Sequence, residues 1–358
     1  MDQIAQFDHL LTSAGPAALR IREYLMPVEG EDGVLFPPTF AASEDNKFPG
    51  GYNIDTFPDG TNICIIDTVG SQANRIEPLF SEENYASLVP QVIIIAGEKK
   101  INLLEAGHRA GDAIVRCSEL QKELKEAFNR VLNGDAESLA KIAPTSLVFG
   151  VWDSRDTQAK LPRLLASTIR AYNVRKLTRS AQYVPAVEYV KVQMLDEPPD
   201  DKVKKAYSKR GFIHVPASNT HGGVIATGGI RREAALHLAA LRTLKASDSE
   251  KTRALRRYIL GLALTAFTYP SAGYLRQGCN LVLNPEKKTE LVMVNNNGST
   301  VPLSFDHQDA LSFAQTTAEA FGVGQSRTVF FDKEAAKKEI AEESKEKDKP
   351  KKPKDKKN

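Results

Sequence analysis

The sequence reads Ser71-Gln72-Ala73-Asn74-Arg75-Ile76-Glu77 shortly after an apolar segment, Ile63-Cys64-Ile65-Ile66. The apolar segment predicts a strand over 61–69, and the polar stretch predicts a helix that begins near Ser71. Small and amide side chains with one arginine at the start of a helix suit the binding of an anion, because they add side-chain donors to the free N–H groups of the first turn. A capped surface helix would carry the same residues, so this stretch alone leaves both interpretations open.

Outward from this strand and helix, apolar patterns predict short strands and helices in irregular alternation. Further strands are expected at 91–95, 145–152, 186–195, 279–283 and 290–294. Further helices are expected at 108–132, 135–142, 161–175, 231–244, 251–267 and 306–321. This irregular order predicts an α+β domain over 1–330 rather than a doubly wound sheet.

Two segments have the composition of long insertions, and one has that of a tail. Residues 27–60 are rich in Pro, Gly, Asp and Asn with scattered aromatic residues, which is typical of a long loop held by aromatic anchors. Residues 196–229 carry three prolines and two glycine pairs, which predicts a projecting loop or hairpin. Residues 331–358 should be disordered, because a mixed Lys/Glu segment with proline gains too little burial to become ordered.

The charge of the chain is unevenly divided. The tail holds 11 Lys and 8 acidic residues, a surplus that equals the formal net charge of +3 for the whole chain. Residues 1–330 hold 37 basic and 37 acidic residues and are neutral overall. Any affinity of this part for nucleic acid must therefore come from local basic patches.

Several kinds of site lack support in the sequence. The cysteines Cys64, Cys117 and Cys279 lie far apart without a CxxC pair, which argues against a zinc site and a disulfide framework. The six histidines are dispersed and no glycine-rich segment completes a phosphate-binding motif, so neither a metal nor a cofactor is expected. No secretory signal is recognised and the longest apolar stretch is too short to span a bilayer, so a cytoplasmic location is expected.

The clearest basic cluster falls within 155–179. It consists of Arg155, Lys160, Arg163, Arg170, Arg175, Lys176 and Arg179. Arg163 and Arg170 are seven residues apart, which on the expected helix would place both on one side, where they could bind successive phosphates. An ordinary solvated helix face would have the same pattern.

A second basic cluster falls in the irregular segment and is followed by apolar residues. It consists of Lys202, Lys204, Lys205, Lys209 and Arg210, with Phe212, Ile213 and Val215 directly after it. A basic loop with apolar tips can lie across a nucleic-acid strand and wedge between bases. A surface loop whose apolar residues pack back on the body remains the alternative.

A third candidate segment is Leu104-Glu105-Ala106-Gly107-His108-Arg109-Ala110-Gly111-Asp112, which is expected to start a helix. His108 and Arg109 near the positive end of that helix could form a base-and-anion site. The alternative is a structural histidine beside a local ion pair between Arg109 and Asp112.

Five short motifs follow one another along the chain. They are Leu19-Arg20-Ile21-Arg22, Leu35-Phe36-Pro37-Pro38-Thr39, Ser71 to Glu77, Leu104 to Arg109, and Phe149-Gly150-Val151-Trp152. Over roughly residues 15–283 the chain resembles the backbone subunit of the type I-G (formerly I-U) CRISPR Cascade effector complex, a RAMP-superfamily protein that coats guide RNA. Agreement of several motifs in order is more specific than any one of them.

This resemblance implies a fold and a function. The fold would be a modified RRM-like (ferredoxin-like) palm with fingers at about 27–60 and a thumb at about 196–226 that closes over the guide. Copies would stack head to tail as a helical filament along the guide RNA (crRNA). The protein would be a non-catalytic subunit, not an enzyme, that presents crRNA for base pairing with target DNA in antiviral defence. The implied partners are other copies of the chain, the large and RNA-processing Cascade subunits and a recruited helicase–nuclease, with no role for a membrane.

The resemblance and the basic clusters together select candidate binding residues. RNA contacts are expected from Ser71, Gln72, Asn74, Arg75, Arg109, Arg155, Arg163, Arg170, Arg175, Arg179, Lys204, Lys205, Lys209 and Arg210. The thumb wedge is expected to consist of Phe212, Ile213 and Val215.

Two other function classes are weaker. A RAMP-type endoribonuclease that processes precursor guide RNA would use His108, His214 or His221 as general acid or base, but no pair of these histidines is set by spacing. A metabolic enzyme with a pocket formed by the finger insertion has no positive support.

Overall fold

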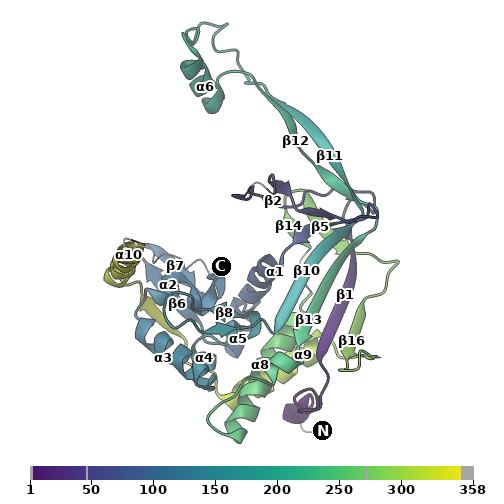
Figure 1. Ribbon diagram of the computed structural model, residues 1–358, viewed down its shortest axis with the longest axis vertical. Helices are drawn as coiled ribbons and strands as arrows, with labels where there is room; N and C mark the ends of the chain where they lie inside the picture. The colour runs from purple at the N-terminus through teal and green to yellow at the C-terminus, as the bar shows by residue number, and fades with distance from the viewer. Residues whose placement is uncertain (1–2, 46, 271–272, 348–358) are drawn as a thin grey trace, which may run out of the picture.

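The computed structural model describes residues 3–45, 47–270 and 273–347, and these form a mixed α+β protein (Figure 1). The main sheet is antiparallel and runs in the order β14 (Tyr274–Arg276), β15 (Cys279–Leu283), β1 (Ala18–Pro27), β13 (Ile230–His237), β10 (Leu165–Tyr172), β5 (Asn62–Asp67) and β4 (Ile54–Thr56). A further strand, β16 (Glu290–Val294), pairs with the first half of β1 and with β17 (Thr300–Pro302).

Alternation along the strands gives the sheet a covered face and an open face. On β1, Leu19 and Ile21 are buried, whereas Arg20 and Arg22 point to the other side. On β13, Arg232 is buried among apolar neighbours and donates to Glu23 at 2.6 Å, so a charged residue occupies a core position of the strand. A buried charge is tolerated there because it is paired.

The covered face of the sheet packs against helices. The longest is α8 (Ser249–Thr268), which lies against α9 (His307–Phe321). At Gly261 the two helices approach so closely that a Cβ atom would lie 2.8 Å from Ala314 Cα. The helices α1 (Val69–Ile76) and α5 (Thr145–Phe149) contact β10, and α7 (Leu238–Leu241) lies between β13 and α8 in the chain.

A smaller sheet, with strand order β18-β6-β7, lies in the part of the protein that also contains α2, α3, α4 and α10 (Figure 1). Its strands are β18 (Arg327–Phe330), β6 (Val92–Ala96) and β7 (Lys99–Asn102), and β18 runs parallel to β6. Its helices are α2 (Ala113–Arg116), α3 (Gln121–Leu132), α4 (Glu137–Ile142) and α10 (Lys333–Lys347). The hydrophobic core is continuous between this part and the helices under the main sheet.

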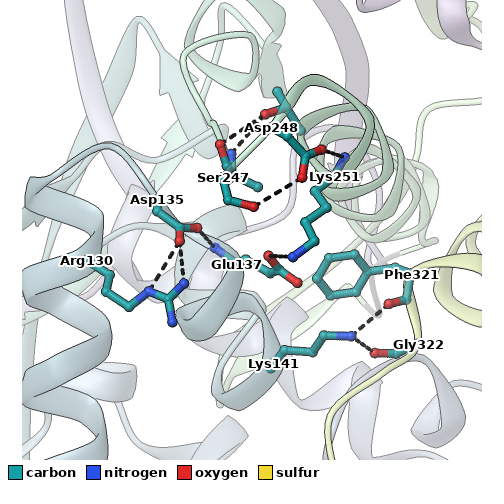
Figure 2. Close-up of polar contacts among 11 residues, drawn as sticks. Arg130, Asp135, Glu137, Lys141, Ser247, Asp248, Lys251, Phe321 and Gly322 are labelled. Atoms are coloured by element: carbon teal, nitrogen blue, oxygen red, sulfur yellow. Dashed lines mark hydrogen bonds and ion pairs between the residues drawn. The ribbon is translucent and has the colours of Figure 1, made fainter.

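Polar contacts connect α4 to the end of α9 and the start of α8, as Figure 2 shows. The ammonium group of Lys141 donates to the carbonyl oxygen of Phe321 at 2.7 Å and also to that of Gly322. Lys251, in the first turn of α8, lies 3.6 Å from the Glu137 carboxylate. The Lys141 contacts satisfy carbonyl groups that the end of α9 leaves without helical partners.

A long two-stranded ribbon projects from the body between β10 and β13. It consists of β11 (Val174–Tyr183) and β12 (Val215–Ala226), which pair from Val174↔Ala226 to Tyr183↔Val215, with α6 (Asp201–Arg210) at its far end (Figure 1). We call residues 174–226 the projection. It begins earlier than the expected segment 196–226, because β11 supplies a complete partner strand for β12.

The remaining strands are short. They are β2 (Thr39–Phe40), β3 (Gly51–Tyr52), β8 (Val151–Trp152) and β9 (Lys160–Leu161). The insertion 27–60 contains β2, β3 and β4 and lies against the base of the projection, where the Gly223 N–H donates to the Tyr52 hydroxyl at 3.1 Å. Single-turn 3-10 helices form at Gln3–Ala5, Asp8–Leu10, Glu77–Ser81, Ala86–Leu88, Leu103–Glu105 and Arg109–Gly111.

The structure confirms the α+β class and many of the expected elements. Strands at 61–69, 91–95, 279–283 and 290–294, and helices near Ser71 and at 135–142, 251–267 and 306–321, occur as predicted within a few residues. The helix expected at 108–132 is divided into a 3-10 turn, α2 and α3. In the part of the chain that the structure describes, no helix is both long enough and apolar enough to cross a membrane.

Four expected elements are wrong. The segment 161–175 forms strand β10 instead of a helix, and 231–244 forms strand β13 followed by the short helix α7. The segment 145–152 is the buried helix α5 with only two strand residues after it, and 186–195 is a series of turns rather than a strand.

The tail also differs from its expected disorder. Residues Lys333–Lys347 form α10, and Arg116 donates to Glu339 of this helix through two contacts of 3.1 and 2.8 Å. The bidentate pair gives the Lys/Glu-rich segment a fixed partner that its composition did not indicate. Residues 348–358 of the expected tail lie outside the described residues.

Candidate nucleic-acid interface

The helix α1 presents a short polar face. The hydroxyl of Thr68 caps the helix by accepting from the Ser71 N–H, and Ala73 and Ile76 are buried on the inner side. Asn74 and Arg75 are exposed and Ser71 is half-buried, so these three residues share the outer side, as their spacing of three and four positions requires. The sequence therefore located correctly a helix with outward hydrogen-bonding groups.

A buried carboxylate at the end of β5 brings two arginines together beside α1. One oxygen of Asp67 accepts from Arg75 Nε at 3.1 Å, and the other accepts from Arg276 Nη2 at 3.2 Å. Asp67 is almost fully buried, whereas the Arg75 side chain is 40% exposed. One negative charge thus holds two guanidinium groups, which leaves a net positive charge at this surface.

Gln72 joins α1 to the sheet and is not available for RNA. Its amide nitrogen donates to Asp67 at 2.7 Å, and its amide oxygen accepts from the Ser167 hydroxyl of β10 at 2.9 Å. The side chain is buried, with 2% of its surface exposed. The expected RNA contact from Gln72 is therefore corrected to a structural role.

Arg109 is also buried, with 3% of its surface exposed. Its Nε atom lies 2.6 Å from Glu77 Oε2, its Nη2 donates to Asn74 Oδ1 at 3.3 Å, and its guanidinium lies 5.3 Å from the centre of the Phe149 ring. The local ion pair with Asp112, the alternative interpretation, does not form; Asp112 accepts instead from the His108 N–H and caps α2. In this structure Arg109 orients α1 rather than facing solvent, which corrects the expected RNA contact.

Burial perturbs both members of this ion pair. It raises the pKa of Glu77 to about 7, against the opposing effect of the Arg109 charge. Burial likewise lowers the pKa of Arg109, although Glu77 opposes the change. Burial therefore disfavours the charged forms of both residues, although the two charges attract each other.

Arg163 extends the α1 surface. It is exposed, its Nε donates to the Phe149 carbonyl at 3.1 Å, and its Nη2 lies 4.0 Å from where a Cβ of Gly70 would be. Arg155 is exposed in the loop between β8 and β9. The α1 surface is defined here as Ser71, Asn74, Arg75, Arg163 and Arg276.

Arg170 does not belong to the α1 surface. It lies on β10, where alternation places Ser167 toward α1 and Arg170 on the open face of the sheet. There it donates to the Thr168 hydroxyl at 2.8 Å and lies 4.0 Å from Glu233, which also accepts from Arg22 at 2.9 Å. The expectation that Arg163 and Arg170 share one helix face is therefore wrong, because the segment is a strand.

The other basic candidates lie on the projection. Arg175 and Arg179 are exposed on β11, and Lys204, Lys205, Lys209 and Arg210 are exposed on α6. Asp200 caps the start of α6 by accepting from the Val203 N–H, and Gly211 ends it in a left-handed conformation with φ of 75°. None of the residues of α6 is buried, so the helix presents its charges at the far end of the ribbon.

The apolar tip packs within the projection. The Phe212 ring makes edge contacts with Tyr189 and Tyr207, at centroid distances of 5.3 and 6.2 Å. Ile213 and Val215 are half-buried. The aromatic cluster that holds Phe212 lies at the end of the projection. Insertion of these apolar residues between bases remains a prediction.

The structure thus brings together Ser71, Asn74, Arg75 and Arg163 and separates them from Arg170 and from the projection residues. It adds Asp67 and Arg276, which sequence reasoning missed. Asp67 gave the better signal, because it directly follows an apolar strand and precedes the capped helix. Arg276 gave none, since it lies 209 residues from Asp67 in the chain.

Comparison with known proteins finds a family match that includes α1. Residues 19–176, from the start of β1 to the beginning of β11, match the model of a family described as CRISPR-associated protein GSU0053 (Cas_GSU0053). No curated protein matches the chain. The match covers α1, Arg163 and Arg170 but not α6, α8 or β13. Over residues 19–176 the chain is similar to this CRISPR-associated protein family.

Proposed function

We propose that the protein is a non-catalytic backbone subunit of a CRISPR Cascade complex, which binds guide RNA along its length and presents it to target DNA. The family match supports a role in a CRISPR system. The observation that carries the proposal is the combination of the α1 surface with a projecting ribbon whose far end is basic. Such separate basic patches suit an extended polyanion better than a small substrate.

The strand order supports an RRM-like palm. β1 is followed by helices including α1, then by β10 and β13, then by α8 and β16, and the four strands lie in the order β16-β1-β13-β10. This order supports a β-α-β-β-α-β arrangement like that of ferredoxin-like folds. On this interpretation the insertion 27–60 corresponds to fingers, and the projection, inserted between the second and third palm strands, corresponds to the thumb.

The guide would be held through its backbone. Arg75, Arg163 and Arg276 offer guanidinium groups, and Ser71 and Asn74 offer neutral donors, which suit phosphate and ribose oxygens. Contacts of this kind do not depend on base identity, so the base edges stay free to pair with target DNA. Sequence specificity would then lie in the guide.

Assembly would follow from the projection. A ribbon that extends from the body can reach a neighbouring copy, and a repeated head-to-tail contact that does not close into a ring builds a helical filament. The large subunit, the RNA-processing subunit and a helicase–nuclease would join such a filament in the complete complex. A cytoplasmic location belongs to the same proposal.

One experiment separates this proposal from the endoribonuclease alternative. The chain is purified after co-expression with a CRISPR array, and the bound RNA is sequenced. Intact RNA of guide length supports the backbone subunit. RNA cut by the purified chain alone supports the nuclease, in which His108, His214 and His221 would be tested by substitution. Absence of bound RNA contradicts both.

A further inference from the structure

Trp152 is the only tryptophan in the chain, and 56% of its surface is exposed. It ends β8, where alternation buries Val151 in the core and turns Trp152 outward. Tryptophan buries a large area when it is covered and is concentrated at sites of binding. Its exposure on a short, paired strand therefore points to a ligand.

The backbone of Trp152 and the α1 surface both lie against the loop at 107–111. A Cβ on Gly111 would be 3.0 Å from the Trp152 carbonyl oxygen, and a Cβ on Gly107 in the same loop would be 3.4 Å from Asn74 Nδ2. Arg163 follows β9, the partner strand of β8. β8 contacts the 3-10 turn Arg109–Gly111, and α5 directly precedes β8 in the chain.

A lysine accompanies the exposed ring. Lys160 is the cross-strand partner of Trp152 in the β8–β9 pair, and its ammonium nitrogen lies 5.2 Å from the ring centre. Lys160 is exposed as well. An aromatic ring with a cation over one face offers partners for the two parts of a nucleotide, a flat base and a charged phosphate.

We infer that Trp152 is a stacking platform for one base of a single-stranded nucleic acid whose phosphates the α1 surface binds. This inference rests on the proposed function and adds a base contact to the phosphate contacts. Stacking accepts every base, because each has a π-face, so the platform would not restrict the guide sequence. Lys160 would bind the phosphate next to the stacked base.

The single tryptophan makes a direct test possible, because all indole fluorescence of the full-length protein comes from this site. Short single-stranded RNA is titrated into the protein and compared with abasic RNA of the same length, with binding of each followed independently by anisotropy of a labelled end. We expect bound RNA to quench Trp152 strongly and bound abasic RNA to quench it little. Equal quenching by the two, or none by bound RNA, would overturn the inference.

Variants provide the second test. Trp152→Ala should weaken binding of short RNA by about 5- to 150-fold, the range that loss of one stacked base gives. Trp152→Phe keeps an aromatic face and should bind nearly as well as the original protein. Phe330→Ala is the matched control, because Phe330 is also 56% exposed but lies on β18 of the smaller sheet, and it should leave affinity unchanged. Full affinity in Trp152→Ala would overturn the inference.

The outcomes distinguish this inference from the proposed function. If the protein retains guide RNA while Trp152 responds to neither RNA nor substitution, only the inference fails. If the fluorescence changes on self-association without RNA, Trp152 belongs to a contact between copies and the inference fails as well. If the protein binds no RNA, both fail.

Discussion

Glu77 and Arg109 form a buried ion pair in which Nε lies 2.6 Å from Oε2, directly beneath the polar face of α1. The same guanidinium donates to Asn74 on α1 and to the Gly150 carbonyl at 3.4 Å. One buried charge thus fixes the position of the helix, the loop at 107–111 and the start of β8 relative to one another.

The titration of Glu77 should make stability depend on pH. Because burial raises its pKa from 4.5 to about 7, the folded state binds this proton more tightly than the unfolded state does. The tighter binding of this proton adds to the free energy of unfolding. The added free energy is complete below about pH 4.5 and is lost as the pH rises to about 7, a change on the order of 3 kcal/mol at most. Urea unfolding across this pH range measures the free energy of unfolding of the original protein and of Glu77→Gln, which cannot ionise at this position. As the pH rises, the free energy of unfolding of the original protein should fall relative to that of the variant. A difference that stays constant with pH would contradict the shifted pKa.

Arg109 should support RNA binding without contacting a phosphate. Arg109→Met should lower the affinity for RNA, because Asn74 loses the contact that orients its amide, but it should leave the slope of log affinity against log salt unchanged. A direct phosphate contact would reduce that slope by about 0.7 on a single strand. Filter binding at several salt concentrations measures the slope, and a reduction of this size would return Arg109 to the list of RNA contacts.

Arg163 and Arg170 should behave differently, since they lie on different faces. Arg163→Glu should weaken RNA binding and reduce the salt slope by about 0.7, the loss of one phosphate contact. Arg170→Gln is the matched comparison and should leave both quantities close to those of the original protein, because Arg170 lies beside Thr168 and Glu233 on the open face. Equal effects of the two substitutions would mean that RNA also contacts the open face.

The same two residues show where sequence reasoning fails. In 161–175, Leu164, Leu165, Ile169 and Tyr172 match a helical spacing, whereas the strand buries the alternating positions 165, 167, 169 and 171. The alternation is hidden because position 167 is a serine, which is buried where its hydroxyl donates to Gln72 and accepts from Arg232. A buried polar residue whose partner lies 95 residues away cannot be recognised from a local pattern.

β13 was missed for a similar reason. Its inward positions are Ile230, Arg232, Ala234 and Leu236, so an arginine interrupts the apolar alternation. β6, whose inward residues are apolar, and α8, whose buried Thr265 bonds within its own helix, were predicted correctly. At the candidate site, the polar face of α1 followed from local capping and spacing, while burial of Gln72 and Arg109 depended on residues from distant segments.

Removal of α10 should affect stability more than RNA binding. A chain that ends at Asp332 loses the bidentate contact between Arg116 and Glu339, which should cost on the order of 1 kcal/mol and lower the melting temperature by a few degrees. Glu339→Gln in the full chain should reproduce most of that loss. RNA retention should be unchanged in both, and failure of the truncated chain to bind RNA would show that the helix takes part in the interface.

The measurement that tests the central claim most directly is the number of copies bound to RNAs of increasing length, counted by native mass spectrometry. The proposal predicts that the number of copies rises in proportion to RNA length. A control in which a short Gly/Ser turn replaces 184–214 keeps the Tyr183↔Val215 pair and removes α6, none of whose residues is buried, so it should fold with a near-normal melting transition but lose this proportionality. A constant number of copies on every RNA, or none, would contradict the claim that the protein is a guide-RNA backbone.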